Sequence, residues 1–384
     1  MMHAIILTAF VFSISMNIQN PVLAASKVKP EEEIRIGTEA AAEVTKESKL
    51  IDDAAMNARV QAIGAAVAAV ANTKQIKATY GHADVYQFNY IMKIVDDKDI
   101  NAFSLPGGFV YVNKGLLEYV QSDDELAGVI AHEIAHASHH HAMSLMKSQD
   151  KQMMATAIGI LLAAGLGAKS NDLGNLAQAA QLISVAKLSA YGQKAEFDAD
   201  RTAVHYMAGT SYNPAGMLTF MERLARDEIR KPQITYGIFA THPPANLRAT
   251  QIIDEMNRLK LPINRRLVTT YMKVQIKQIP DSSAYSINIM GSEITKVADT
   301  ESMKASLRAQ QVTDDLSQAL ISGARMNNVR IGNNGRTVMV LSKPIYSPTD
   351  EDAALAGTSV EQITKSAADA IKKAMLNELL EQSI

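Results

Sequence analysis

Two histidines four residues apart, with a glutamate after the first, lie inside a strongly apolar segment of this chain. The motif is His132-Glu-Ile-Ala-His136, of the form H-E-x-x-H, and residues 126–131 before it carry no charge. Side chains at positions i and i+4 share one face of an α-helix, so both imidazoles can bind one metal ion. Burying such polar groups costs free energy unless they are hydrogen-bonded or metal-bound. The segment therefore predicts a buried helix, beginning near residues 123–125, that carries a metal site.

Glu133 lies between the two histidines and has a different expected role. With about 3.6 residues per turn, its side chain is rotated about 100° from that of His132, which places the carboxylate beside the metal. A zinc ion lowers the pKa of a bound water molecule, and a nearby carboxylate can take its proton as general base. We therefore predict that Glu133 is the catalytic base of a zinc-dependent peptidase. Histidines satisfied by hydrogen bonds alone are the alternative.

A catalytic zinc ion usually takes three protein ligands and leaves one position open. The chain has no cysteine, so the third ligand must be a histidine or a carboxylate. The candidates are Glu196, Asp198, Asp200, His205 and His242. Glu196 and Asp200 lie four residues apart in a predicted helix, so Glu196 can bind the metal while Asp200 orients a ligating imidazole. An exposed acidic face, paired with Lys194 and Arg201, is the alternative.

Three motifs occur in order along the chain: Asn101-Ala-Phe-Ser-Leu-Pro-Gly-Gly108, His132-Glu-Ile-Ala-His136 and Glu196-Phe-Asp-Ala-Asp200. Together they resemble the gluzincin family that includes HtpX, the CAAX prenyl protease and BepA. The resemblance extends roughly over residues 30–260. It implies one zinc ion per chain, bound by the two histidines and by Glu196, with Glu133 as the base.

The same resemblance implies the fold, an α+β arrangement with a mainly helical zincin-like domain and a small sheet. It also implies a substrate strand above the metal helix. The short β run at the end of the first motif is the candidate, comprising Phe109, Val110, Tyr111 and Val112. A strand edge pairs with an extended polypeptide and demands little of its sequence. An ordinary core strand is the alternative for this segment.

Further candidates lie on either side of these motifs. His242, in the loop Thr241–Pro244, could stabilise the oxyanion of the reaction, occupy the open zinc position and silence the enzyme, or cap the following helix. Arg248 could pair with a carboxylate near the site. His140 follows His136 by four residues and is a candidate to support that ligand, although an exposed helix end is the main expectation for residues 139–141.

The domain organisation follows from changes in residue composition and pattern along the chain. An apolar run too short to span a bilayer comfortably precedes Val22-Leu-Ala-Ala25, so residues 1–25 are predicted to be a signal peptide. Residues 26–262 form the predicted metallopeptidase domain. Alternating strands and two helices predict a small α+β domain over residues 263–384, with no histidine and a role in binding another protein or in scaffolding. An uncleaved N-terminal anchor is the alternative to a cleaved signal.

Composition excludes several other classes. With 38 basic against 40 acidic side chains and no long basic stripe, no nucleic-acid partner is expected. The apolar stretch 153–168 is too short for a confident membrane span, and a buried helix or a peripheral membrane contact remain open for it.

These patterns predict a periplasmic or secreted zinc endopeptidase. Its substrate would be unfolded or extended polypeptide, namely misfolded or misassembled envelope proteins, as the family resemblance implies. A chaperone-like or scaffolding protein with a mainly structural zinc site is the alternative, although a closed site needs no base such as Glu133.

Overall fold

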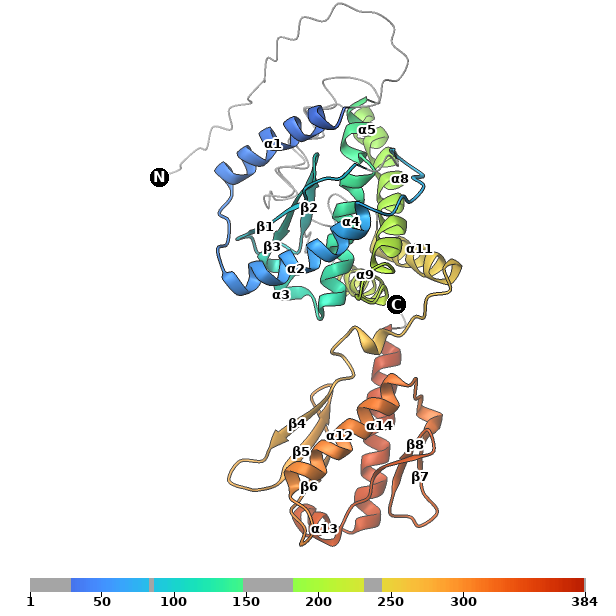
Figure 1. The fold of residues 1–384 in the computed structure, drawn as a ribbon. Coiled ribbons are helices and arrows are strands. Elements are labelled where there is room, and N and C mark those ends of the chain that lie inside the picture. The colour runs from blue at the N-terminus through green and yellow to red at the C-terminus, as the bar shows by residue number, and fades with distance from the viewer. Residues whose placement is uncertain (1–28, 83–85, 148–181, 231–243, 383–384) are drawn as a thin grey trace, which may run out of the picture.

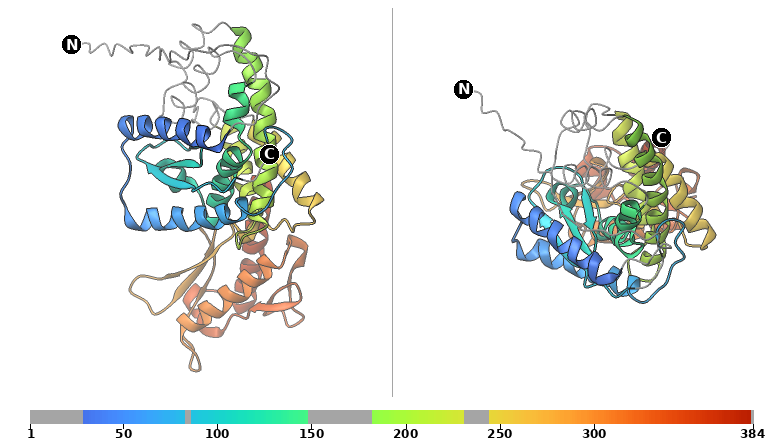
Figure 2. Two further views of the ribbon diagram at one scale, coloured as in Figure 1. Left: turned by 45° about the horizontal axis from the view of Figure 1, so that its top comes forward. Right: turned by 90° about the horizontal axis from the view of Figure 1, so that it is seen from above.

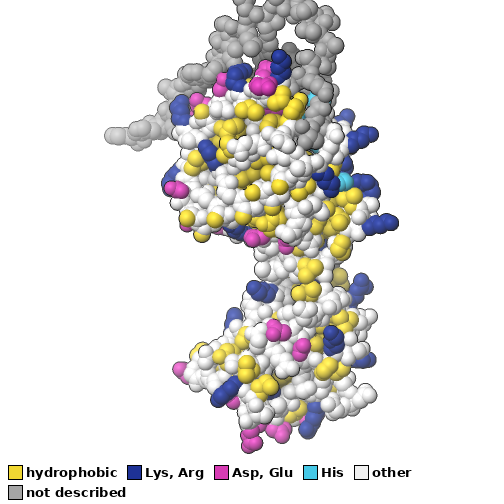
Figure 3. All heavy atoms as spheres, viewed as in Figure 1, with side chains coloured by type: hydrophobic (Ala, Val, Ile, Leu, Met, Phe, Trp, Pro, Cys, Tyr) yellow, Lys and Arg dark blue, Asp and Glu magenta, His cyan; other side chains and the backbone are white. Residues whose placement is uncertain are grey.

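The computed structural model describes residues 29–82, 86–147, 182–230 and 244–382. It contains two parts joined at a narrow neck, which the space-filling view shows from one side (Figures 1 and 3). The first part is mainly helical with one small sheet, and the second combines two small sheets with helices. The predicted α+β class is therefore confirmed. The predicted signal peptide and the apolar stretch 153–168 lie outside the described residues.

Helices and one sheet make up the first part. Its elements are α1 (Pro30–Glu47), α2 (Ala54–Ala71), β1 (Ile91–Val95), β2 (Ala102–Leu105), β3 (Phe109–Asn113), α3 (Lys114–Tyr119), α4 (Asp123–Ser138), α5 (His141–Lys147), α8 (Leu182–Met207), α9 (Ala215–Arg230) and α11 (Ala245–Arg258). The sheet order is β1-β3-β2, with β3 parallel to β1 and antiparallel to β2. The sheet lies between α1 and α2, and α4 packs beside it (Figure 2).

Helix α4 is the central element of this part. The Ser122 hydroxyl caps its N-terminus by accepting a hydrogen bond from the backbone N–H of Glu125, and acidic residues fill its first turn. Its apolar side chains, such as Ile130 and Ile134, are completely buried where the helix packs against α2, α8 and α9. The helix that carries the H-E-x-x-H motif is thus held on several sides, which fixes the direction of its side chains.

Helix α2 is the one described helix long and apolar enough to cross a membrane by length and composition. Its buried residues Val60, Ile63 and Val67 belong to the hydrophobic core of the first part. A core helix meets the same criteria, so this finding is no evidence for membrane insertion.

The second part contains η1 (Arg265–Leu267), β4 (Val274–Gln278), β5 (Tyr285–Ile289), β6 (Ser292–Val297), α12 (Ala305–Ile321), η2 (Met326–Asn328), β7 (Val329–Ile331), β8 (Val338–Val340), β9 (Lys343–Tyr346), α13 (Asp350–Ala356) and α14 (Val360–Gln382). Two antiparallel three-stranded sheets pack against α12 and α14 around a core of their own. Because each part has its own core, we propose that residues 26–262 and 263–384 are separate domains.

Two arginine side chains form charged forks near the neck, and one of them links the two parts. Arg265 bonds both carboxylate oxygens of Glu222 in α9, at 2.6–3.1 Å, and so joins the second part to the first. Arg266 makes a similar fork with Glu378 and also donates to the carbonyls of Leu320 and Ala324, all within the second part. Planar guanidinium groups suit this two-pronged pairing.

Asp352 is the buried charged anchor of the second part. Its carboxylate accepts hydrogen bonds from Arg308 at 2.7 and 2.9 Å and from the backbone N–H groups of Ala298 and Thr349. Burial alone would raise the pKa of this carboxyl, but these donors outweigh it and the pKa is lowered. The charged form of Asp352 therefore stabilises the fold.

We expect this stabilisation to depend on pH. A carboxyl whose pKa is lower in the folded than in the unfolded chain stabilises the fold above the unfolded value of about 4, and the benefit is lost as the pH falls below it. The difference in free energy of unfolding between the natural protein and Asp352→Asn should therefore shrink from pH 7 to pH 3, as measured by chemical denaturation. Asp350→Asn, at an exposed position in the same helix, is the control and should show no such trend. A difference that stays constant with pH would contradict the expectation.

Candidate metal centre

Helices α4 and α8 bring three donor groups together. His132 and His136 come from α4, and Glu196 comes from α8, which packs along it. The Nε2 atoms of the two histidines lie 3.0 Å apart. The Glu196 carboxylate oxygens lie 3.2 Å from Nε2 of His132 and 3.3 Å from Nε2 of His136. The three candidate ligands from sequence thus meet at one point, although they are sixty residues apart in the chain.

This arrangement fits a zinc ion. Zinc binds histidine nitrogen and carboxylate oxygen at about 2.0–2.2 Å in a tetrahedron, which places neighbouring donors about 3.3–3.6 Å apart. The observed separations of 3.0–3.3 Å lie at or slightly below the lower end of that range. Both Nε2 atoms face the same point, and two imidazoles with one carboxylate are a usual donor set for catalytic zinc. Three protein donors leave a fourth position for a water molecule or a substrate.

Glu133 lies beside this donor group rather than within it. Its side chain is 5% exposed, and its Oε2 accepts a hydrogen bond of 3.0 Å from the hydroxyl of Ser104 in β2. The carboxylate therefore lies between the metal helix and the sheet. No sequence pattern marks Ser104, since a lone serine in a short strand carries no signal.

Asp200 and Arg248 both contact the His132 ring. The Nδ1 atom of His132 lies 2.8 Å from Oδ1 of Asp200, so it donates its proton there, and the lone pair of Nε2 can then bind a metal. Arg248, from α11, forms a fork onto both oxygens of Asp200, at 2.7 and 2.8 Å. All three side chains are at most 3% exposed. Arg248 thus pairs with a carboxylate near the site, as was suggested for it from the sequence.

The electrostatics of this group follow from burial and from Arg248. Burial alone would raise the pKa of Asp200, but the nearby guanidinium outweighs it, and the pKa lies well below its usual range. Burial and Arg248 both lower the pKa of His132, yet Asp200 and Glu196 more than compensate and raise it to about 9. A metal ion at this site would therefore displace a proton from the His132 ring.

Residues 139–141 do not form an exposed helix end, and that expectation is wrong. Helix α4 ends at Ser138, and His140 adopts a left-handed conformation with φ of 53°, which turns the chain back into the protein. His139, His140 and His141 are 2%, 4% and 1% exposed. Nδ1 of His140 faces Glu33 of α1 at 2.6 Å, so His140 does not contact His136 in the way that its spacing suggested.

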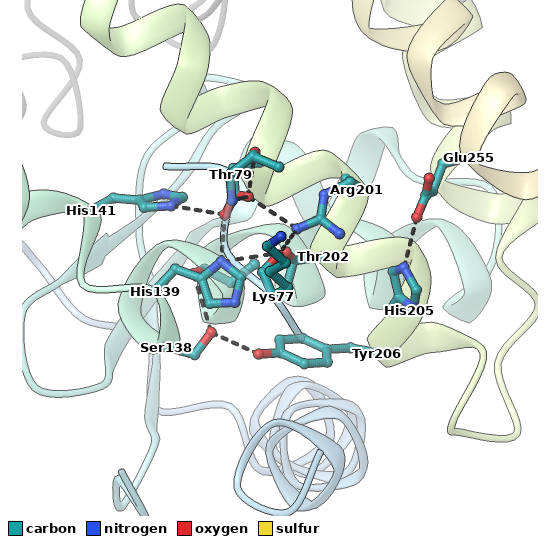
Figure 4. Close-up of polar contacts among 12 residues, drawn as sticks. Lys77, Thr79, Ser138, His139, His141, Arg201, Thr202, His205, Tyr206 and Glu255 are labelled. Atoms are coloured by element: carbon teal, nitrogen blue, oxygen red, sulfur yellow. Dashed lines mark hydrogen bonds and ion pairs between the residues drawn. The ribbon is translucent and has the colours of Figure 1, made fainter. Parts of the chain in front are cut away.

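His141, rather than His140, contacts the ligand. Its Nδ1 lies 3.0 Å from Nδ1 of His136, and its Nε2 lies 3.2 Å from Oδ2 of Asp198. His139, Thr79 and Arg201 also contact the Asp198 carboxylate. Figure 4 shows these three side chains close to His141. Burial lowers the pKa of His141 to about 4, although Asp198 acts in the opposite sense, so the ring is neutral at pH 7. Helical spacing could not reveal His141, because it lies beyond the end of α4.

The proposed substrate strand needs correction. Residues 109–112 belong to β3, which pairs with β1 on one side and β2 on the other. Val110, Tyr111 and Val112 are completely buried, so this central strand offers no free backbone edge to a polypeptide. The edge strand near the metal helix is β2, which contributes Ser104. The sequence predicted the strand but not its central place in the sheet.

The remaining candidate metal ligands either have other partners or lie outside the described residues. His205, considered as a ligand, instead pairs with Glu255 of α11 at 2.7 Å. Asp198 faces His139 and His141 and not the three donors. His242 lies outside the described residues, so its possible roles stay predictions.

The helical fold, the H-E-x-x-H helix and the carboxylate from a later helix are together the architecture of a zincin-like metallopeptidase. Residues 54–256, more than half of the chain, match the family model described as "Peptidase family M48". The chain belongs to peptidase family M48, and the resemblance seen in its three motifs is confirmed. Residues 286–378 match a second model, described as "Domain of unknown function (DUF8459)".

Curated relatives share this first part. The beta-barrel assembly-enhancing protease of Escherichia coli (strain K12) is 29% identical over 181 residues, which cover 46% of this chain and 36% of the relative. Metalloprotease LoiP of the same organism is 28% identical, covering 43% and 62%. The mitochondrial metalloendopeptidase OMA1 of Schizosaccharomyces pombe is 30% identical, covering 47% and 49%. The matched stretches span less than two thirds of each relative.

Proposed function

We propose that this protein is a zinc-dependent endopeptidase that hydrolyses peptide bonds in exported polypeptides. The observation that carries the proposal is the meeting of three zinc-type donors, from His132, His136 and Glu196, with the buried carboxylate of Glu133 beside them. A structural zinc site is closed by four protein ligands and needs no adjacent base. Three donors with a free carboxylate at hand fit hydrolysis better.

Each side chain near the three donors would have its own role in the reaction. A zinc ion at this site would supply Lewis acidity, both to a water molecule and to the scissile carbonyl. Glu133 would take a proton from the attacking water and deliver it to the leaving amine, while Ser104 holds the carboxylate in place. Asp200, fixed by Arg248, would keep His132 in the tautomer that presents Nε2.

We also propose that β2, rather than β3, receives the substrate. It is an edge strand of its sheet, it packs against α4, and its Ser104 touches Glu133. An extended polypeptide added to this edge would run past the donor group, with affinity from backbone hydrogen bonds and little dependence on sequence. Such recognition suits unfolded substrates.

The proposal also covers the substrate, which we take to be an exported protein located in the cell envelope. The N-terminal sequence supports export, as does similarity to a protein named for beta-barrel assembly. Misfolded or misassembled envelope proteins are the substrates that we propose on this basis. The second part, with its own core and its link to α9 through Arg265 and Glu222, would then position the peptidase on another protein.

Metal removal tests this function. We expect purified protein to bind one zinc ion per chain, to lose cleavage of unfolded casein on chelation, and to recover it with one equivalent of zinc. The measurement is elemental analysis with a cleavage assay, and circular dichroism should show that the fold survives chelation. Magnesium, which prefers six oxygen ligands, is the control and should not restore cleavage. Cleavage that persists in metal-free protein would contradict the proposal.

A further inference from the structure

His141 is placed between a candidate zinc ligand and a buried carboxylate. One ring nitrogen lies 3.0 Å from Nδ1 of His136, and the other lies 3.2 Å from Asp198. His141 and Asp198 are 1% and 0% exposed, so no bulk water competes for these contacts. The three side chains form a continuous line from the metal centre into the protein.

The positions of the protons along this line follow from the chemistry of imidazole. A neutral ring carries one N–H, so His136 can bind a metal through Nε2 only if its proton is on Nδ1. Nδ1 of His141 must then accept that hydrogen bond, which places the proton of His141 on Nε2. That N–H faces the carboxylate of Asp198, which can only accept. Each donor therefore meets an acceptor, and no other arrangement leaves Nε2 of His136 free.

Asp198 is itself held in place. Its Oδ1 accepts hydrogen bonds from the backbone N–H and the hydroxyl of Thr79 and from Arg201, while Oδ2 faces His139 and His141. Gly81, with φ of 79°, lets the loop after Thr79 press against the turn. A Cβ there would lie 2.1 Å from the carbonyl oxygen of His139 and 2.9 Å from the His141 ring.

A second metal ion among His139, His141 and Asp198 is the competing interpretation, since their donor atoms also lie close together. The charge of Arg201, whose NH2 is 3.1 Å from Asp198, opposes a cation at that carboxylate. The contact between His141 and His136 also gives the ring a different use. Hydrogen bonding therefore accounts for the cluster better than a metal does.

We propose that His141 is a positioning residue that fixes the tautomer and the orientation of His136, with Asp198 as its anchor. The inference rests on the proposed zinc site and deepens it, because it gives His136 a support through His141, as Asp200 gives one to His132. Each ligating histidine would then be oriented from behind, one directly and the other through a second imidazole.

The test is the zinc affinity of purified variants, measured by competition with a chromogenic chelator. His141→Phe keeps a ring but removes both hydrogen bonds, so we expect about 10- to 100-fold weaker zinc binding. His141→Gln retains one acceptor and one donor and should recover part of the affinity. If the phenylalanine variant fails to fold, His141→Gln takes its place in the zinc-affinity measurement.

His139→Phe is the matched control. It removes a neighbouring buried imidazole from the same carboxylate but no contact with His136, so it should lose thermal stability as His141→Phe does while keeping natural zinc affinity. Equal zinc affinity in His141→Phe and the natural protein would overturn the proposal, as would an equal loss of affinity in His139→Phe. Two zinc ions per natural chain, with one lost in both variants, would replace it with a second metal site.

Failure of the proposed function would give a different result from failure of the His141 proposal. In that case the natural protein would bind no zinc or would not cleave casein. Unchanged zinc affinity in His141→Phe, alongside a natural protein that binds zinc and cleaves, would remove only the role of His141.

Discussion

Glu133→Gln should lower the rate of peptide hydrolysis by about 10²- to 10⁴-fold, the usual contribution of a general base. The amide is close in size to the carboxylate and can still accept the hydrogen bond from Ser104, so the fold should be unchanged. It cannot take a proton from water. Zinc affinity should persist because the three donor atoms come from other residues. The measurements are kcat on a fluorogenic peptide and zinc content.

Glu118→Gln is the control for this experiment. It makes the same chemical change at an exposed position on α3, whose side chain is paired loosely with Lys114 at 3.7 Å. Its activity should match that of the natural protein. If Glu133→Gln cleaved as fast as the control, the peptidase proposal would fall, and unchanged biological activity of that variant would favour the chaperone-like alternative.

Arg248→Met should cost about 3–5 kcal/mol of the free energy of unfolding, the typical cost of leaving a buried charge without its partner. Asp200 is 1% exposed, and Arg248 supplies both bonds of the fork that neutralises it. Methionine fills much of the volume but leaves the carboxylate unpaired. Urea denaturation in the presence of chelator measures the loss, since a bound metal would otherwise add its own stabilisation.

Two further variants make this result specific. Arg258→Met removes an arginine from the same helix, but that side chain is 59% exposed, and its partner Glu255 keeps a second contact with His205. Its cost should stay within about 1 kcal/mol. Adding Asp200→Asn to Arg248→Met should recover part of the stability, because the unpaired charge disappears. A loss from Arg248→Met no larger than that from Arg258→Met would show that the buried pair is not a major support of the site.

The metal helix could be predicted from sequence because its signals are local. The caps, the apolar residues and the i to i+4 spacing of His132 and His136 all lie within one helix, where geometry follows from 3.6 residues per turn. Pairing with Glu196 could be proposed because its own helix presents it together with Asp200, and because the family resemblance gave it a role. The place of Glu133 beside the donors follows from the same rotation.

The errors concern contacts between distant segments. The composition of residues 109–112 shows that they form a strand, but whether a strand is central or at an edge depends on its partners, here β1 and β2. The spacing from His136 favoured His140 only as long as the helix continued, whereas the left-handed residue after Ser138 turns His141 toward the ligand instead. Ser104 became visible only once β2 packed against α4.

The sequence by itself determined the class of protein, since the three motifs in order along the chain resemble a metallopeptidase family and the family is confirmed. Only the tertiary structure decided which groups hold the candidate ligands and which strand lies at the edge of the sheet. The reason is physical: helical periodicity relates neighbours along one element, whereas the approach of Asp200, Arg248, His141 and β2 depends on how separate elements pack. That packing is set by the shared core, which no short segment encodes alone.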